Sequence, residues 1–308
     1  PPHHLSDRRQ RQMCIRDSCA MNLVSTPEAI EIELKFGLRD CGVDRISLAL
    51  EDLLQCDIGA QTDTLKNAYY DYRGVLHKHG VAIRTRSVGN RHEMTVKVRH
   101  VVESWLSRRE ERNIRILEPA LDYGALDELP LPDPVITVIK NRSLNPVFEN
   151  VFVRTDWRIG YADCDFMLSL DKGSVRVGSR ESPVSEIELE LISGDENRMI
   201  EFGCELADLL PSFMAVISKA ERGDRLIRSA HPMRDLRPRQ KRDWLYWLSR
   251  ALDPLSGPAP DQAYLALKAL GEPEALAAFG EPIARSELPL GLARWMVELS
   301  LGSMRGTD

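Results

Sequence analysis

Charged and apolar residues alternate without a break in the segment EIELKFGL, residues 31–38. Glu31, Glu33 and Lys35 occupy odd positions, and Ile32 and Leu34 lie between them. Because successive side chains of a strand point to opposite faces, this pattern predicts a strand with one apolar and one ionised face. The ionised face meets either water or a charged ligand, and the alternation by itself allows both.

Seven further runs show strand-like composition or alternation, and Gly, Pro, Asn or Asp separates many of them. They cover residues 67–72, 81–88, 92–101, 111–117, 151–161, 165–173 and 184–193. With the first run they predict about eight short strands, which is typical of an antiparallel sheet or barrel. Helical spacing predicts a helix from Asp44, as its N-cap, to Leu54, and short helices within 119–130 and 195–210. The expected fold class is therefore α+β.

The composition changes after about Gly223, where basic residues gather between positions 222 and 243. Four later segments, 243–255, 261–271, 273–280 and 291–304, are predicted to be helices interrupted by Pro and Gly. We therefore expect a main domain over residues 21–228 and a short helical C-terminal appendage over residues 229–308. The basic cluster is more typical of a solvated linker than of an anion site; it comprises Arg234, Arg237, Arg239, Lys241 and Arg242.

The first 20 residues have neither a hydrophobic period nor the apolar core of a signal peptide. They resemble the translation of a sequencing-adapter sequence. Their composition is equally consistent with an ordinary disordered tail. For this reason residues 1–20 are left out of the expected fold.

Charge and hydropathy argue against two classes of partner. The 308 residues carry a formal net charge of −6, which gives no reason to expect nucleic acid. No apolar run reaches the roughly 18 residues of a membrane-spanning helix, so we expect no membrane partner. The six cysteines form no C-x-x-C pair and no metal-ligand cluster with histidines, which favours a thiol-bearing cytoplasmic protein. The oligomeric state does not follow from the sequence.

Several other predicted strands also gather charged residues on one face, and on most of them the charges have the same sign. The shared faces are Arg84 with Arg86, Lys97 with Arg99, Glu111 with Arg115, and Glu186 with Glu188 and Glu190. These charges point either outward around an apolar interior or inward around a polar lumen, in which case helices must cover the apolar outer face. Exposed faces usually mix the signs of their charges, so the recurrence of this pattern favours the lumen. Such a lumen suits a polyanion together with bound Mg²⁺ or Mn²⁺.

An ordered set of motifs also resembles the CYTH family, the triphosphate tunnel metalloenzymes. E-x-E-x-K is present at residues 31–35, and YYDYRGVLHKHGVAIRTR is similar to the family stretch YFDT…GIALRVR. Further segments match in the expected order: MTVKVR, SRREERNI, PVFENVFVRTDW, LSLDKG, SEIELELISGD and SKAERGDRL. The resemblance covers about residues 29–226 and extends to the bacterial inorganic triphosphatases that carry a CYTH domain. The chain departs from the pattern in a shorter loop without Thr-Pro and in Asn150, where Thr is common.

The resemblance implies an eight-stranded antiparallel β-barrel, with covering helices, around a hydrophilic triphosphate tunnel. The catalytic residues implied are Glu31, Glu33, Lys35, Glu111 and Asp171. The substrate-binding residues implied are Lys35, Arg84, Arg86, Lys97, Arg109, Arg154 and Lys219. The metal ligands implied are Glu31, Glu33, Glu186, Glu188 and Glu190, with Mg²⁺ or Mn²⁺ as cofactor. Asp171 also fits a turn before Lys-Gly, and Arg154 also fits a structural pair with Asp156 or a wall carboxylate. Tyr69, Tyr70 and Trp157 are expected to pack the barrel.

The activity implied is metal-dependent hydrolysis of inorganic triphosphate to pyrophosphate and phosphate. Thiamine triphosphatase or adenylate cyclase activity is the alternative within the family, and a polyphosphate-binding module without turnover is the alternative outside catalysis. The expected partner is triphosphate or another small polyphosphate. Related triphosphatases often continue into a histidine-containing helical domain called CHAD, so the appendage resembles either a short addition or the start of such a domain.

Overall fold

The computed structural model describes residues 29–102, 106–228, 241–253, 259–285 and 287–304. Its strands are β1 (Ala29–Leu38), β2 (Ala60–Asp71), β3 (Val81–Val88), β4 (Arg91–Val102), β5 (Leu106–Ile116), β6 (Asn145–Tyr161), β7 (Cys164–Val177), β8 (Arg180–Ser193) and β9 (Ser212–Met214). Its helices are α1 (Val43–Leu54), α2 (Val75–Lys78), α3 (Tyr123–Asp127), α4 (Asp133–Lys140), α5 (Glu196–Leu209), α6 (Lys219–Arg228), α7 (Lys241–Leu252), α8 (Pro260–Ala269), α9 (Pro273–Ala284) and α10 (Leu292–Met304). The leader at residues 1–20 and the basic residues Arg234, Arg237 and Arg239 lie outside the described residues.

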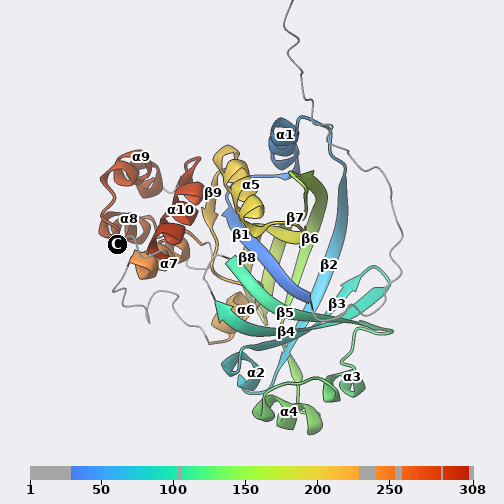
Figure 1. Ribbon diagram of the computed structural model, residues 1–308. Helices are drawn as coiled ribbons and strands as arrows, with labels where there is room; N and C mark the ends of the chain where they lie inside the picture. The colour runs from blue at the N-terminus through green and yellow to red at the C-terminus, as the bar shows by residue number, and fades with distance from the viewer. Residues whose placement is uncertain (1–28, 103–105, 229–240, 254–258, 286, 305–308) are drawn as a thin grey trace, which may run out of the picture.

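Eight antiparallel strands close into a barrel (Figure 1). Their order is β5-β4-β3-β2-β6-β7-β8-β1, and pairing of β1 with β5 completes the ring. The short strand β9 adds to β1 outside this ring. The closed barrel confirms the eight-stranded antiparallel barrel that the resemblance implied, and it decides between the sheet and the barrel that the alternating runs left open.

The two faces of β1 meet different surroundings. Leu34 and Phe36 are buried in the main hydrophobic core, together with Phe202 and Leu206 of α5. Glu33 and Lys35 are also buried, but they line the lumen of the barrel. Of the two arrangements that the pattern left open, the structure adopts the polar lumen with an apolar outer face covered by helices.

Helices cover the barrel on separate sides (Figure 1). The helices α5, α7, α8, α9 and α10 gather on one flank beside β9, whereas α3 and α4 lie at the other end near β4. Below β3 and β4, Ile83 and Val96 form a second core with Leu126, Val135 and other residues of α3 and α4. Among the helices that the structure describes, none has the length and apolar character that crossing a membrane requires.

Local predictions differ from the structure in a few places. The predicted N-cap Asp44 is wrong: Gly42 caps α1 without a side-chain hydrogen bond. Asp44 lies in the first turn instead, where its charge is favourable near the positive end of the helix dipole. The helices α2, α4 and α6 and the strand β9 were not predicted. Trp157 packs in the main core as expected.

Candidate active site

The barrel lumen holds a cavity of about 610 Å³. Most residues that the sequence nominated for a site face it. Those that line it are Glu31, Glu33, Lys35, Arg84, Arg86, Lys97, Glu111, Arg154, Glu188, Glu190 and Lys219. Asp171 and Glu186 lie buried behind this lining, against Lys219. Arg109 belongs to β5 and is the register partner of Glu31, but its side chain is outside the described residues.

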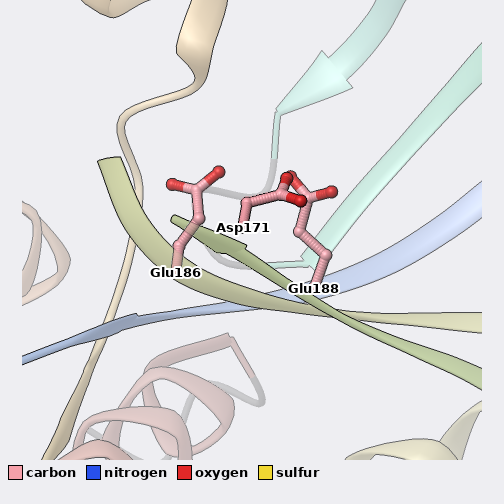
Figure 2. Close-up of side chains that lie close together, drawn as sticks. All are labelled: Asp171, Glu186 and Glu188. Atoms are coloured by element: carbon pink, nitrogen blue, oxygen red, sulfur yellow. The ribbon is translucent and has the colours of Figure 1, made fainter. Parts of the chain in front are cut away.

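Lys219, the first residue of α6, binds three carboxylates at once. Its Nζ lies 2.6 Å from Asp171 Oδ2, 2.5 Å from Glu186 Oε1 and 2.8 Å from Glu188 Oε1. Figure 2 shows these three carboxyl groups gathered over β7 and β8. Burial alone lowers the pKa of Lys219, but the attraction of the three carboxylates outweighs it and raises the pKa above its ordinary value. Lys219 is therefore held as a cation at the wall of the cavity.

Arg154 of β6 reaches the same carboxylates from the other side. Its Nε and Nη2 donate to the two oxygens of Asp171 at 2.7 and 2.6 Å, and Nη2 also donates to Glu188 Oε2 at 2.6 Å. Burial raises the pKa of Asp171, but Lys219 and Arg154 hold it below its ordinary value. Asp171 lies inside β7, so its alternative assignment to a turn is wrong. The wall carboxylates, rather than Asp156, are the partners of Arg154.

Lys35 joins β1 to this group. Its Nζ lies 2.9 Å from Glu188 Oε1, 3.3 Å from Glu33 Oε1 and 3.4 Å from Glu186 Oε1. Lys35 and Glu188 are register partners on β1 and β8, so the antiparallel pairing itself brings them together. We call Asp171, Glu186 and Glu188 the inner triad; Lys35, Arg154 and Lys219 supply one cation for each of its carboxylates.

A second group of carboxylates lies on β1, β5 and β8, where Lys35 contacts Glu33 and Arg84 Nη2 lies 3.7 Å from Glu111 Oε1. We call Glu31, Glu33, Glu111 and Glu190 the acidic end of the lumen. Lys97 Nζ lies 3.0 Å from Glu31 Oε2 and also contacts Glu111, while Glu33 and Glu190 are direct register partners on β1 and β8. In the part of the chain that the structure describes, the side-chain carboxylate of Glu190 makes no hydrogen bond or ion pair.

The environment of Glu190 shows the resulting excess of negative charge. Burial, followed by repulsion from Glu33 and Glu111, raises the pKa of Glu190 above its ordinary value. Like charges directly opposite each other on paired strands are destabilising. A cation at the acidic end would relieve this repulsion.

A basic wall lies on other strands of the same cavity. Arg84 and Arg86 come from β3, and alternation in the strand points both into the lumen. Arg86 Nε donates to Asn67 Oδ1 at 2.9 Å, and within the described ranges it has no carboxylate partner at ion-pair distance. Burial, followed by repulsion from Arg84 and Arg154, lowers the pKa of Arg86 to about 10. Arg84 pairs with Glu111 at 3.7 Å, so the charge that lacks a carboxylate partner on this wall is that of Arg86.

A match to a family model identifies the family to which this chain belongs. The family model described as the CYTH domain matches residues 29–223, which is more than half of the chain. The chain belongs to the CYTH family. An inorganic triphosphatase from Haemophilus influenzae is 30% identical over 160 residues, covering 52% of this chain and 45% of that protein. The chain thus matches less than half the length of this relative.

Two solved structures are similar to this chain at TM-scores below 0.5, and they carry no weight in the family assignment. The Hippeastrum protein HpAC1, described as having a dominant triphosphatase activity, is 19% identical with a TM-score of 0.45, covering 65% of this chain and 95% of its own. The PH1819 protein of Pyrococcus horikoshii is 18% identical with a TM-score of 0.38, covering 58% of this chain and 89% of its own.

The cavity of this CYTH domain also includes polar residues that the sequence reasoning missed. They are Glu93 on β4, Asn113 on β5, Ser169 on β7 and Ser218 before α6. Glu93 precedes Lys97 by four residues on one strand, and Asn113 follows Glu111 by two. Residues at an even spacing share a strand face, so the alternation could have identified both as lumen residues. Tyr69 lines the cavity as well, and its ring stacks on Phe148 with centroids 4.4 Å apart, which agrees with its expected packing role.

The two carboxylate groups of the CYTH domain differ in their fit to a divalent metal. The carboxylates of the inner triad lie within 4.8 Å of one another, but the ammonium of Lys219 lies among them, at hydrogen-bond distance from each. At the acidic end, Lys35 contacts Glu33 at 3.3 Å, whereas the carboxylate of Glu190 has no ion pair among the described residues. Mg²⁺ is typically bound by one or two carboxylates and by substrate phosphates, so the acidic end fits it better.

Proposed function

We propose that the chain hydrolyses inorganic triphosphate to pyrophosphate and phosphate with the help of Mg²⁺ or Mn²⁺. The observation that carries this proposal is that one lumen holds both a carboxylate and a guanidinium that have no ion pair among the described residues, Glu190 and Arg86. A triphosphate with bound metal complements both. The activity named for the Haemophilus influenzae relative supports the same substrate class.

The cations of the lumen bind the substrate in this proposal. Arg84, Arg86 and Arg154 present guanidinium groups whose planar N–H donors match phosphate oxygens. Lys35, Lys97 and Lys219 add ammonium groups, and Arg109 remains a predicted member of the set. Together they offset the charge of the triphosphate and the charge that develops on the leaving pyrophosphate.

The acidic end holds the metal in this proposal. Glu33 and Glu190 are the principal ligands, and Glu31 and Glu111 complete the set. A divalent metal held by these carboxylates would supply Lewis-acid polarisation of the phosphates and activation of water. Glu188 also faces the cavity, whereas Glu186, the remaining predicted ligand, is buried against Lys219 and Lys35.

The same carboxylates orient the attacking water and accept its proton, because they are the acceptor groups at the metal side of the cavity. Asp171 has an indirect role. It is buried against Arg154 and Lys219 and fixes the direction in which both cations enter the lumen.

We also propose the expected cytoplasmic location, which the free, buried thiols of Cys41, Cys164 and Cys204 support. The division into a tunnel domain at 21–228 and a helical appendage at 229–308 remains part of this proposal.

Phosphate release from inorganic triphosphate should require Mg²⁺ or Mn²⁺. Without metal, the charges of Glu33 and Glu190 would face the charge of the substrate, so excess chelator should abolish turnover and added metal should restore it. The assay is phosphate release with each metal and with chelator. Full turnover in excess chelator would exclude the metal-dependent mechanism.

Assays with other substrates distinguish the alternative functions. Faster hydrolysis of thiamine triphosphate, or formation of cyclic AMP from ATP, would assign one of the other family activities. Tight triphosphate binding without phosphate release would assign the binding module, although binding an anion requires cations and not this many carboxylates.

Arg86→Met should raise the KM for triphosphate by about 10- to 100-fold, as expected for the loss of a hydrogen bond to a charged group. The melting temperature should stay the same or rise, because burial already disfavours the charged form of Arg86. Arg91→Met, the same change at an exposed position of β4, is the control and should leave both values unchanged. An unchanged KM in Arg86→Met would remove Arg86 from the binding set.

A further inference from the structure

A buried ion pair joins α6 to the end of α7. Arg222 Nη1 donates to Asp253 Oδ1 and Nη2 donates to Asp253 Oδ2, each at 2.7 Å. The two residues are 2% and 3% exposed. A bidentate pair of this kind fixes orientation as well as distance. Asp253 lies outside residues 29–223, which the family model matches, so the appendage supplies this contact to the CYTH domain.

The helix that receives this contact also carries Lys219. Arg222 follows Lys219 by three residues, so the two side chains lie on neighbouring positions of the helix surface. Lys219 enters the cavity wall and binds the inner triad, whereas Arg222 points to Asp253 and also donates to Ser182 Oγ of β8 at 3.3 Å. A displacement of α6 at Arg222 therefore moves Lys219 as well.

The barrel leaves α6 little room on its inner side. A Cβ at Gly223 would lie 2.5 Å from the ring of Phe148, so the backbone of α6 approaches β6 as closely as glycine permits. This packing resists movement of α6 into the barrel. Movement away from the barrel is opposed by the packing of Ala220 and Leu226 against the core around Phe148, and the pair between Arg222 and Asp253 adds to it.

We propose that Asp253 is a positioning residue for Lys219: through Arg222 it holds α6 against the barrel and keeps the ammonium among the carboxylates of the inner triad. The C-terminal helices thereby form part of the catalytic unit, and this consequence for turnover rests on the proposed function. Loss of the contact should release Lys219 from the cavity wall. Triphosphate binding should then weaken, because one cation of the lumen is lost.

The test compares Asp253→Asn with Asp208→Asn. Asp208 Oδ2 of α5 accepts a hydrogen bond from Arg294 Nε of α10 at 2.6 Å, so both substitutions break an arginine–carboxylate pair between the C-terminal helices and the rest of the chain. Asp208→Asn leaves α6 untouched. The full chain is used throughout, because the appendage is the element under test.

The first measurement is acylation of Lys219 by an anhydride, followed by peptide mass spectrometry. Lys219 is 6% exposed and should react slowly in the unsubstituted protein, whereas the exposed Lys66 serves as an internal reference. In Asp253→Asn, labelling of Lys219 should rise by about fivefold or more, which corresponds to about 1 kcal/mol. Labelling in Asp208→Asn should match the unsubstituted protein. Equal labelling in all three proteins, or an equal rise in both variants, would overturn the proposal.

The second measurement is the kinetics of triphosphate hydrolysis. Asp253→Asn should raise KM more than it lowers kcat, because a binding cation is displaced while the acidic end is unchanged. If the unsubstituted protein does not hydrolyse triphosphate, the proposed function fails, and the labelling comparison still decides the role of Asp253. If Asp253→Asn does not fold, Arg222→Lys replaces it: this variant keeps the charge, loses the bidentate geometry and should also expose Lys219. Protection of Lys219 in a folded Arg222→Lys protein would overturn the proposal.

Discussion

Replacing Glu33 by Gln should lower triphosphate turnover by about 100- to 1000-fold, the usual cost of one correctly placed electrostatic group in a preorganised site. Glu33 is 4% exposed, lines the cavity and faces Glu190 across β1 and β8. The substitution keeps the shape of the side chain and one acceptor oxygen, but it removes a negative charge from the proposed metal site. The measurement is kcat at saturating metal and triphosphate.

The barrel of Glu33→Gln should remain folded. The change removes repulsion between Glu33 and Glu190, and Lys35 keeps its contacts with Glu188 and Glu186. The melting temperature without metal should therefore stay the same or rise, whereas the stabilisation produced by added metal should shrink. Glu149→Gln makes the same chemical change at an exposed position of β6 and should alter neither value. Near-normal turnover and metal dependence in Glu33→Gln would contradict the metal site at the acidic end.

Replacing the next residue, Leu34, by Ala should lower the free energy of unfolding by about 2–5 kcal/mol, the range for truncating a buried leucine. Leu34 is fully buried on the outer face of β1. A Cβ at Gly203 of α5 would lie 2.4 Å from Leu34 Cδ2, which shows how closely the helix packs over this side chain. Truncation should leave a cavity between β1 and α5, because neither element can move inward without disturbing other contacts. The measurement is chemical denaturation.

Comparing Glu33→Gln with Leu34→Ala tests the separate roles of the inner and outer faces of β1. In Leu34→Ala, turnover per folded molecule should stay close to normal at low temperature, because the charged residues of the lumen are unchanged. The outer-face assignment would be wrong if Leu34→Ala left the stability unchanged. It would also be wrong if the folded variant had lost the metal dependence of turnover.

The alternation of residues predicts much of the barrel because it is a local property. Each strand places every second side chain on the same face, so Arg84 and Arg86, or Glu188 and Glu190, could be grouped without knowledge of the fold. The missed residues Glu93 and Asn113 follow the same rule. The helix α6 was missed for the opposite reason: its sequence, KAERGDRLIR, is mostly polar and contains Gly223, and it is packing against Phe148 that explains this glycine.

The sequence by itself determined which residues share a strand face and that the charged faces recur from strand to strand, because a period of two depends on neighbours in the chain. It left open whether those faces meet water or a lumen. Tertiary structure decided this point, since closure of β1 onto β5 and the packing of α5 over Leu34 turn Glu33 and Lys35 inward.

Tertiary structure also decided how the charges are paired. Lys219 meets carboxylates more than 30 residues away in the chain, and Arg222 meets Asp253 across a similar separation. The strength of an ion pair depends on distance and burial in space, and neither is encoded in the local pattern. For this reason the sequence nominated nearly all the charged groups of the lumen, but only the folded chain shows that cations surround the inner triad while the carboxylate of Glu190 has no ion pair among the described residues.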